Sequence, residues 1–146
     1  MLWSLPRGGE VKAMSLLKWR DAYRIGIVEV DHEHQQLIAQ INALLETSRD
    51  GSATAVANAL GELHAQIAAH FALEEKLMRS QQYSGYAAHR EDHEQLLDEL
   101  RDVMDRHELI GRYRAAALAE RLVPWFTKHF STHDARWHAS LGAGRA

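Results

Sequence analysis

The sequence predicts an all-α protein, an antiparallel up-down four-helix bundle with an extended N-terminal arm. Apolar residues recur at helical spacing over most of the chain, no strand-and-hairpin pattern interrupts them, and only short breaks separate the periodic segments. The chain has 146 residues, 46% hydrophobic and 25% charged, which is typical of one soluble domain. These values exclude collagen-like, disordered and membrane-embedded proteins.

The N-terminal part of the chain differs from the rest. We interpret residues 1–13 as a disordered or misassigned extension and residues 14–146 as the domain, because Met14 opens a segment that reads more naturally as a start. Residues 18–30 alternate apolar and polar positions and carry few helix signals. They predict an extended arm that packs on the domain.

Four helical segments follow, bounded by residues that favour helix ends. The first ends at Gly51, and the second begins behind a cap formed by Ser52 or Thr54. Pro124 lies inside the last segment, so we expect a kink near residues 119–120 or a restart of the helix. The predicted helices are residues 31–48, the segment from the cap to residue 80, residues 86–108 and residues 112–138.

Charge and composition exclude several function classes. The net charge is −3 with neutral histidine, so no basic surface for nucleic acid is indicated. No run reaches the ~18 apolar residues of a membrane span, and the first residues lack the apolar core of a signal peptide, so we expect a cytoplasmic protein without membrane insertion. With no cysteine and ten histidines in the chain, any metal site must use imidazole and carboxylate ligands.

Histidines fall on the apolar faces of all four predicted helices. Residues three, four or seven apart share a helix face, which puts His34 in line with Leu37 and Ile41. By the same rule His70 lies one turn from Glu74. The remaining histidines on these inward faces are His89 and His93 on the third helix and His129 on the fourth.

The spacing of these histidines predicts that they meet. Thirty-six residues separate His34 from His70, and 36 separate His93 from His129. When two antiparallel helices of equal length are joined by a short turn, the chain returns to its starting position along the bundle axis. We therefore expect all four helices to bring imidazoles to the same position along this axis. A lone core histidine is more often a hydrogen-bonded structural residue. Five at one level, with the inward carboxylate of Glu74, favour a metal site, since a buried carboxylate is costly without a cation.

We expect this site to be dinuclear, because one carboxylate can bridge two ions through its two oxygens. The other histidines are predicted to lie outside it. His32 and His138 are interpreted as surface residues and His64 as half-buried. His107 lies about 21 Å along the helix from His93 and cannot reach the same ions.

Several of these residues also form a family pattern. The chain resembles the hemerythrins, and among them the bacterial hemerythrins, over about residues 17–137. The matching residues are Trp19, Gly26-Ile27, Val30-Asp31-His32-Glu33-His34-Gln35-Gln36-Leu37, His70-Phe71-Ala72-Leu73-Glu74-Glu75, Met78, Tyr83, His89, His93, Trp125, His129-Phe130 and Asp134.

The resemblance implies a centre of two iron ions, Fe²⁺ or Fe³⁺, joined by a bridging oxo or hydroxo group, with O2 as its ligand. It further implies that Phe71 and Trp125 belong to an apolar wall that excludes water. In the family pattern one iron is held by His89, His93 and His129, the second by His34 and His70, and both by Glu74 and Asp134. The second iron is then five-coordinate and offers its open position to O2.

Helical spacing and the resemblance disagree about one ligand. From His129 a regular helix selects His133, four residues on, whereas Asp134 lies about 140° away. We follow the resemblance, because a second bridging carboxylate balances the charge of the irons and another histidine does not. A local π-bulge or loosened turn would bring Asp134 inward.

We therefore expect an oxygen-binding protein for carriage, storage or sensing rather than an enzyme, with weak oxidase or peroxidase activity compatible with the site. The alternatives are a di-iron enzyme (an oxidase, a peroxidase or a nitric-oxide-handling protein) and a signalling module for O2 or iron. The first alternative is disfavoured because ferritin-like enzymes use Glu-x-x-His pairs and a carboxylate-rich shell. We expect a monomer that passes oxygen or a signal to an unidentified protein partner.

Overall fold

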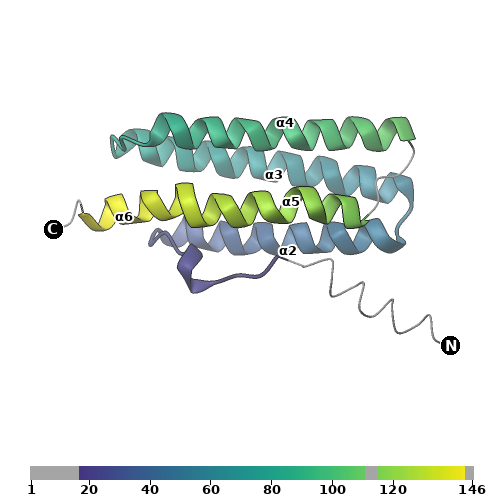
Figure 1. Ribbon diagram of the computed structural model, residues 1–146, viewed down its shortest axis with the longest axis horizontal. Helices are drawn as coiled ribbons and strands as arrows, with labels where there is room; N and C mark the ends of the chain where they lie inside the picture. The colour runs from purple at the N-terminus through teal and green to yellow at the C-terminus, as the bar shows by residue number, and fades with distance from the viewer. Residues whose placement is uncertain (1–16, 111–114, 144–146) are drawn as a thin grey trace.

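The predicted all-α four-helix bundle is confirmed. The structure is a computed structural model and describes residues 17–110 and 115–143, a part of the chain that contains helices and no strands. Four long helices lie side by side in alternating directions (Figure 1). They are α2 (Val28–Asp50), α3 (Ala53–Ser80), α4 (Tyr86–Ile110) and α5 (Ala115–His129), the last continued by a π-helical turn, η2 (Phe130–Asp134), and by α6 (Ala135–Ala143). The predicted extension over residues 1–13 lies outside the described residues.

The N-terminal arm packs along α2, as predicted, but it is shorter than expected. Leu17 exchanges two hydrogen bonds with the Asn42 side chain, at 2.9 and 2.7 Å, and a short 3-10 helix, η1 (Asp21–Tyr23), follows. The predicted end of the arm at residue 30 is wrong, since α2 begins at Val28.

The carboxylate of Asp31 accounts for this early start. It accepts hydrogen bonds from the backbone N–H groups of Ile25, at 2.6 Å, and Gly26, at 3.1 Å. Gly26 has a φ of 95°, a conformation that favours glycine. The chain therefore turns at Gly26 and enters the helix before residue 31.

The last helical segment is interrupted at the loosened turn expected before Asp134 and not at Pro124. A restart at Pro124 is wrong, because α5 runs without a break from Ala115 to His129. Leu118, Leu122 and Phe126 continue its buried face across the proline, and their packing compensates for the one missing hydrogen bond. The interruption is instead the π-helical turn Phe130–Asp134.

The helix ends carry the expected local signals. The Ser52 side chain accepts a hydrogen bond from the N–H of Ala55, at 3.1 Å, and caps α3 as predicted.

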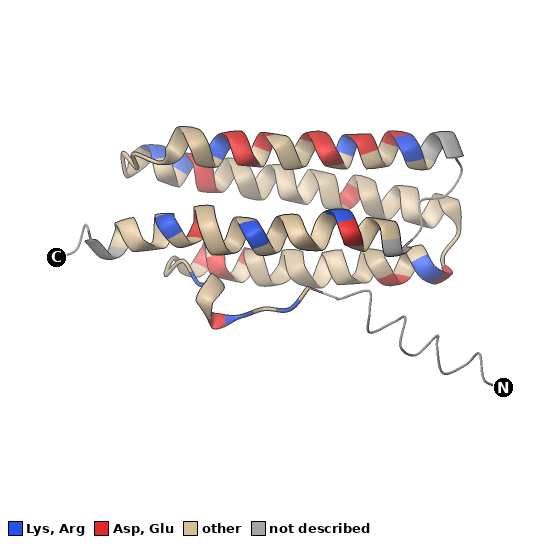
Figure 2. Ribbon diagram, viewed as in Figure 1, with Lys and Arg blue, Asp and Glu red and all other residues tan. Residues whose placement is uncertain are grey.

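Acidic and basic residues follow one another along α4, whereas most of α3 carries neither (Figure 2). Ion pairs one turn apart on α4, such as Arg90–Glu94 at 3.1 Å, support this exposed helix. No described helix is long and apolar enough to cross a membrane.

The core has two apolar parts. The larger one fills the half of the bundle away from the α3–α4 turn, and its buried residues include Ile41, Leu45, Leu60, Leu63, Leu96, Leu100 and Leu122. A smaller cluster near that turn contains Ile25, Val30, Met78 and Trp137. Between these two parts, the helix faces that point inward carry histidine and carboxylate side chains.

Candidate metal centre

The helices bring all seven predicted ligand residues into the interior. Each of these side chains is at most 3% exposed, and the predicted inward orientation of the five histidines is confirmed. The residues are His34 on α2, His70 and Glu74 on α3, His89 and His93 on α4, His129 on α5 and Asp134 on η2.

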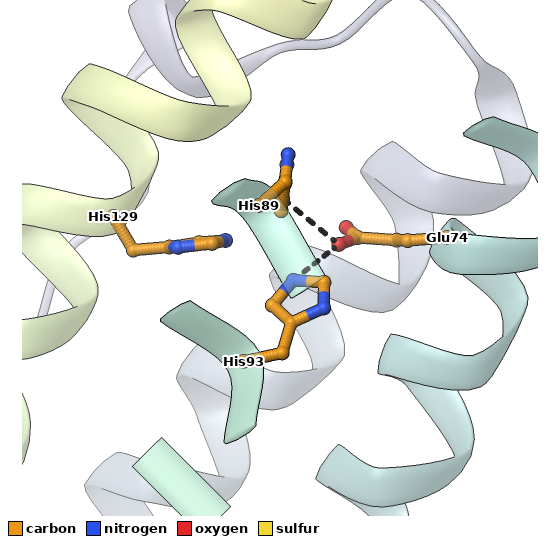
Figure 3. A group of neighbouring side chains, drawn as sticks. All are labelled: Glu74, His89, His93 and His129. Carbon is orange, nitrogen blue, oxygen red and sulfur yellow. Dashed lines mark ion pairs between the residues drawn. The ribbon is translucent and has the colours of Figure 1, made fainter. Parts of the chain in front are cut away.

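The first group of side chains is formed by Glu74, His89, His93 and His129, whose ligand atoms all lie within 4.8 Å of one another. His129 and Glu74 point toward each other from α5 and α3, with the two α4 histidines between them (Figure 3). Glu74 Oε1 lies 3.1 Å from His93 Nε2 and 3.7 Å from His89 Nε2. Three imidazoles and one carboxylate therefore surround a space of metal-ion dimensions.

A second group shares Glu74 with the first. His34, His70 and Glu74 also bring their ligand atoms within 4.8 Å of one another. The other carboxylate oxygen, Oε2, lies 2.6 Å from His34 Nε2 and 2.8 Å from His70 Nε2. Oε1 of Glu74 thus lies beside two histidines of the first group and Oε2 beside both histidines of the second, which is the arrangement of a bridging carboxylate.

Asp134 forms a second link between the two groups. Its Oδ1 lies 3.0 Å from His89 Nε2 and 3.1 Å from His129 Nε2, and its Oδ2 lies 3.6 Å from His34 Nε2. The predicted π-bulge is confirmed: the extra residue in the turn Phe130–Asp134 rotates Asp134 inward until it is 0% exposed. His133 remains at the edge, with a side chain 22% exposed.

Unpartnered buried atoms test whether a metal pair fits here. Several nitrogen and oxygen atoms at the centre form no hydrogen bond among the described residues, although each lies 3.0–3.6 Å from an atom of the opposite kind in another ligand residue. These atoms are Glu74 Oε1, His89 Nε2, His93 Nε2, His129 Nε2, Asp134 Oδ1 and Asp134 Oδ2. Each such atom costs about 1–3 kcal/mol when left unpaired, and cations would pair all of them. Imidazole nitrogens and carboxylate oxygens are suitable ligands for iron, so the donor set fits the implied centre.

Electrostatics in the metal-free site point in the same direction. Burial alone would lower the pKa of His129, but the negative charge of Asp134 at 3.1 Å and a hydrogen bond with Asp92 raise it to about 10. Burial likewise opposes charging of His70, whereas Glu74 and Glu33 raise its pKa to about 9. Despite burial, His70 and His34 hold the pKa of Glu74 well below its ordinary value. The site favours anionic carboxylates with a positive charge between them.

A further set of carboxylates holds the outer nitrogens of the histidines. Nδ1 of His70 is 2.6 Å from Glu33 Oε1, and two other histidines have equivalent contacts. These contacts are His93 Nδ1 with Glu75 Oε2 at 3.0 Å and His129 Nδ1 with Asp92 Oδ2 at 2.7 Å. The sequence alone predicts no role for these acids. Each one directly precedes or follows a predicted ligand in the chain, and this adjacency is the signal that could have identified them.

Aromatic rings cover the imidazoles on the side of the larger core. Phe71 stacks on His93, with ring centroids 3.7 Å apart and 4° between the planes. Trp125 stacks on His129 at 4.6 Å and 11°. Both residues that the resemblance implied for an apolar wall therefore contact predicted ligands directly.

The remaining histidines lie outside the centre. His32 and His138 are exposed and His64 is half-buried, as predicted, although His138 Nδ1 contacts the carbonyl oxygen of Ile25 at 2.5 Å. His107 is buried, and its Nε2 lies 2.8 Å from the carbonyl oxygen of Ala53 at the opposite end of α3. It is remote from the centre, as its position on the helix predicted.

Known proteins share both the sequence pattern and the fold. The model of the hemerythrin HHE cation binding domain matches residues 25–141. A bacteriohemerythrin of Stenotrophomonas maltophilia is 30% identical over 121 residues, which cover 83% of this chain and 78% of the relative. A hemerythrin of Siphonosoma cumanense is 29% identical, over 84% of this chain and 92% of the relative.

Solved structures agree with these relatives. The crystal structure of a wild-type hemerythrin superposes with a TM-score of 0.77 at 21% identity, and the match covers 86% of this chain and 97% of that one. This likeness shows the fold. The sequence relatives together with the buried histidine and carboxylate cluster support a di-iron, oxygen-binding protein.

Proposed function

The chain belongs to the hemerythrin family, and from this premise we propose that it holds two iron ions and binds O2 reversibly at one of them. One observation carries the proposal. The two oxygens of Glu74 lie beside histidines of two separate buried groups that share this carboxylate, one group with three imidazoles and the other with two. A single structural metal would require neither the second group nor the second carboxylate.

The ligands divide unequally in this proposal. His89, His93 and His129 hold one iron, and His34 and His70 hold the other. Glu74 and Asp134 would bridge the two ions together with a solvent-derived oxo or hydroxo group. The ion with two imidazoles would then have one ligand fewer than its neighbour and would offer that open position to O2. The unequal count of imidazoles about the shared carboxylate supports the asymmetry.

A pair of ferrous ions held by these residues would supply the electrons that O2 binding requires. The protein contributes position and exclusion of water. Glu74 and Asp134 bring negative charge into a fully buried space, which offsets much of the charge of the ions. Phe71, Trp125 and Phe130 pack against the histidine rings, and their apolar surface keeps water and protons away from the ligand position, which slows oxidation of the iron.

We propose carriage, storage or sensing of oxygen as the role of this site rather than turnover. Five imidazoles against two bridging carboxylates differ from the carboxylate-rich shell of ferritin-like di-iron enzymes. Weak oxidase or peroxidase activity is compatible with the same centre and is an outcome that the experiment below distinguishes.

Optical spectroscopy of the reduced, iron-loaded protein tests the proposal. We expect two iron ions per chain and a visible absorption band that appears on exposure to air and disappears when oxygen is removed, over repeated cycles. Rapid irreversible oxidation accompanied by turnover of an added reductant would establish the enzyme instead. Binding of fewer than two ions per chain would overturn the dinuclear centre.

A further inference from the structure

The carboxylates that contact the outer nitrogens of the histidines follow a regular pattern around the bundle. Each acid lies on one helix and binds the histidine of the next helix along the chain. Glu33 on α2 contacts His70 on α3. The other two pairs are Glu75 on α3 with His93 on α4, and Asp92 on α4 with His129 on α5. These contacts link α2, α3, α4 and α5 in succession through the site.

The contacts divide the five histidines into two classes. In His70, His93 and His129 the Nδ1 atom contacts a carboxylate oxygen at 2.6–3.0 Å, while Nε2 faces Glu74 or Asp134. These three rings are held at both nitrogens. His34 and His89, in contrast, have no hydrogen-bond partner for Nδ1 among the described residues.

A carboxylate at Nδ1 has two effects on a metal-bound imidazole. It accepts the Nδ1–H hydrogen bond, which fixes the tautomer and leaves the Nε2 lone pair directed at the metal. Its negative charge also makes the imidazole a stronger donor, and this stabilises the more highly charged state of the metal. Orientation survives replacement of the acid by its amide, because an amide oxygen still accepts the hydrogen bond, whereas the charge effect does not.

We propose that Glu33, Glu75 and Asp92 are positioning residues that orient His70, His93 and His129 and lower the reduction potential of the metal pair. This inference rests on the dinuclear centre proposed above. His34 and His89 are the ligands without such support, so each iron would receive one imidazole whose Nδ1 has no carboxylate partner among the described residues.

The three acids differ in their access to water. The side chain of Glu33 is 39% exposed, compared with 18% for Glu75 and 22% for Asp92. Glu33 and His70 also line a surface pocket of about 260 Å³ between α2 and α3. Since water weakens electrostatic interactions, Asp92 and Glu75 have the larger influence on the potential and Glu33 the smaller.

The experiment compares the amide and alanine variants of each acid in the full chain. Binding of Co²⁺ is measured by spectroscopic titration, and the midpoint potential of the iron-loaded protein is measured by redox titration. We expect Asp92→Ala to weaken Co²⁺ binding ~10–100-fold. We expect Asp92→Asn to bind Co²⁺ nearly as wild type but to raise the potential by about 59 mV, which corresponds to a tenfold change in a one-electron equilibrium. Glu91→Gln, an exposed neighbour on α4, is the matched control for loss of one charge.

The outcomes separate this inference from the proposed function. If wild-type protein binds fewer than two Co²⁺ ions per chain, the dinuclear centre itself fails. If it binds two and Asp92→Asn has the same potential as Glu91→Gln, the charge effect is refuted and the acids only orient the rings. If Asp92→Ala also retains the wild-type affinity for Co²⁺, the positioning role is refuted as well.

Discussion

The two halves of this bundle are equally buried but differ in what fills them. In the half away from the α3–α4 turn, leucine and isoleucine side chains such as Leu60 and Ile41 interlock at 0% exposure. The other half contains a small apolar cluster near the α3–α4 turn and, between it and the larger core, Glu74 and Asp134. These two side chains are equally inaccessible, yet several of their oxygens have no hydrogen-bond partner among the described residues. The same four helices therefore build one half that is complete by itself and one that is complete only with cations.

This difference indicates which half stabilises the fold when no metal is bound. Burial of apolar surface stabilises the first half by roughly 25 cal/mol per Å² whether or not metal is present. The second half carries polar atoms that are costly until they are paired. We infer that the apolar half stabilises the packing of the helices with or without metal, whereas the polar half is stabilised by bound ions. Substitutions in the apolar half should therefore change the free energy of unfolding, and substitutions in the polar half should change the iron content.

The largest expected effect is that of Glu74→Gln. Each oxygen of Glu74 faces one of the two histidine groups, so loss of its charge removes the bridging ligand from both ions. We expect stable binding of both irons to be lost, as measured by iron content per chain. Circular dichroism should still show a helical protein, because the apolar half is unchanged.

Glu62→Gln provides the control for this prediction. Glu62 lies on the same helix as Glu74 but is exposed, so its substitution should leave two irons per chain. Retention of both irons in Glu74→Gln would contradict the assignment of Glu74 as the bridge.

The next prediction tests the π-helical turn. Asp134 contacts both histidine groups, whereas His133 lies at the edge and its Nε2 is 3.8 Å from Asp92. We expect Asp134→Ala to lose iron and His133→Ala to keep two ions per chain. The opposite result would show that regular helical spacing, and not the π turn, selects the ligand.

The ligands at the centre show what a sequence can and cannot predict. His34, His70, His93 and Glu74 were predictable because their side chains follow the apolar periodicity of regular helices. Asp134 was not predictable from spacing, since its orientation depends on one extra residue in a turn; only the family resemblance indicated it.

The outer acids show a second limit. Glu33 and Asp92 lie at the flanks of their helices, where a charged residue normally faces water. Only the placement of the next helix shows that they contact His70 and His129. The early start of α2 at Val28 has a similar origin, since it depends on the hydrogen bonds that Asp31 accepts from the arm.

The complementary substitution in the apolar half is Leu60→Ala. Leu60 is 0% exposed within the larger core, and truncation of a buried leucine typically costs about 2–5 kcal/mol. We expect the free energy of unfolding, measured by urea denaturation of the metal-free protein, to fall by this amount. Iron content per folded chain should stay at two. A loss of iron in folded Leu60→Ala would show that the two halves are coupled rather than separate.

The smallest expected effect is the release of protons when metal enters the polar half. In the metal-free protein the pKa values of His70 and His129 are raised to about 9 and about 10, so both rings are protonated at pH 7.5. A metal ion at Nε2 displaces one proton from each, which gives a release of about two protons from these residues. Isothermal titration with Co²⁺ in buffers of different ionisation enthalpy measures this number.

The sign of the pH dependence follows from the same displacement. Because protons compete with the metal, the observed affinity for Co²⁺ should rise with pH through the neutral range and level off only at about pH 9–10, where both rings are already neutral. Ordinary histidines would level off near pH 6.5. If the affinity for Co²⁺ levels off near pH 6.5 and no protons are released at pH 7.5, then Glu74 and Asp134 do not hold charged imidazoles between them. The polar half would in that case depend less on cations than its unpartnered oxygens indicate.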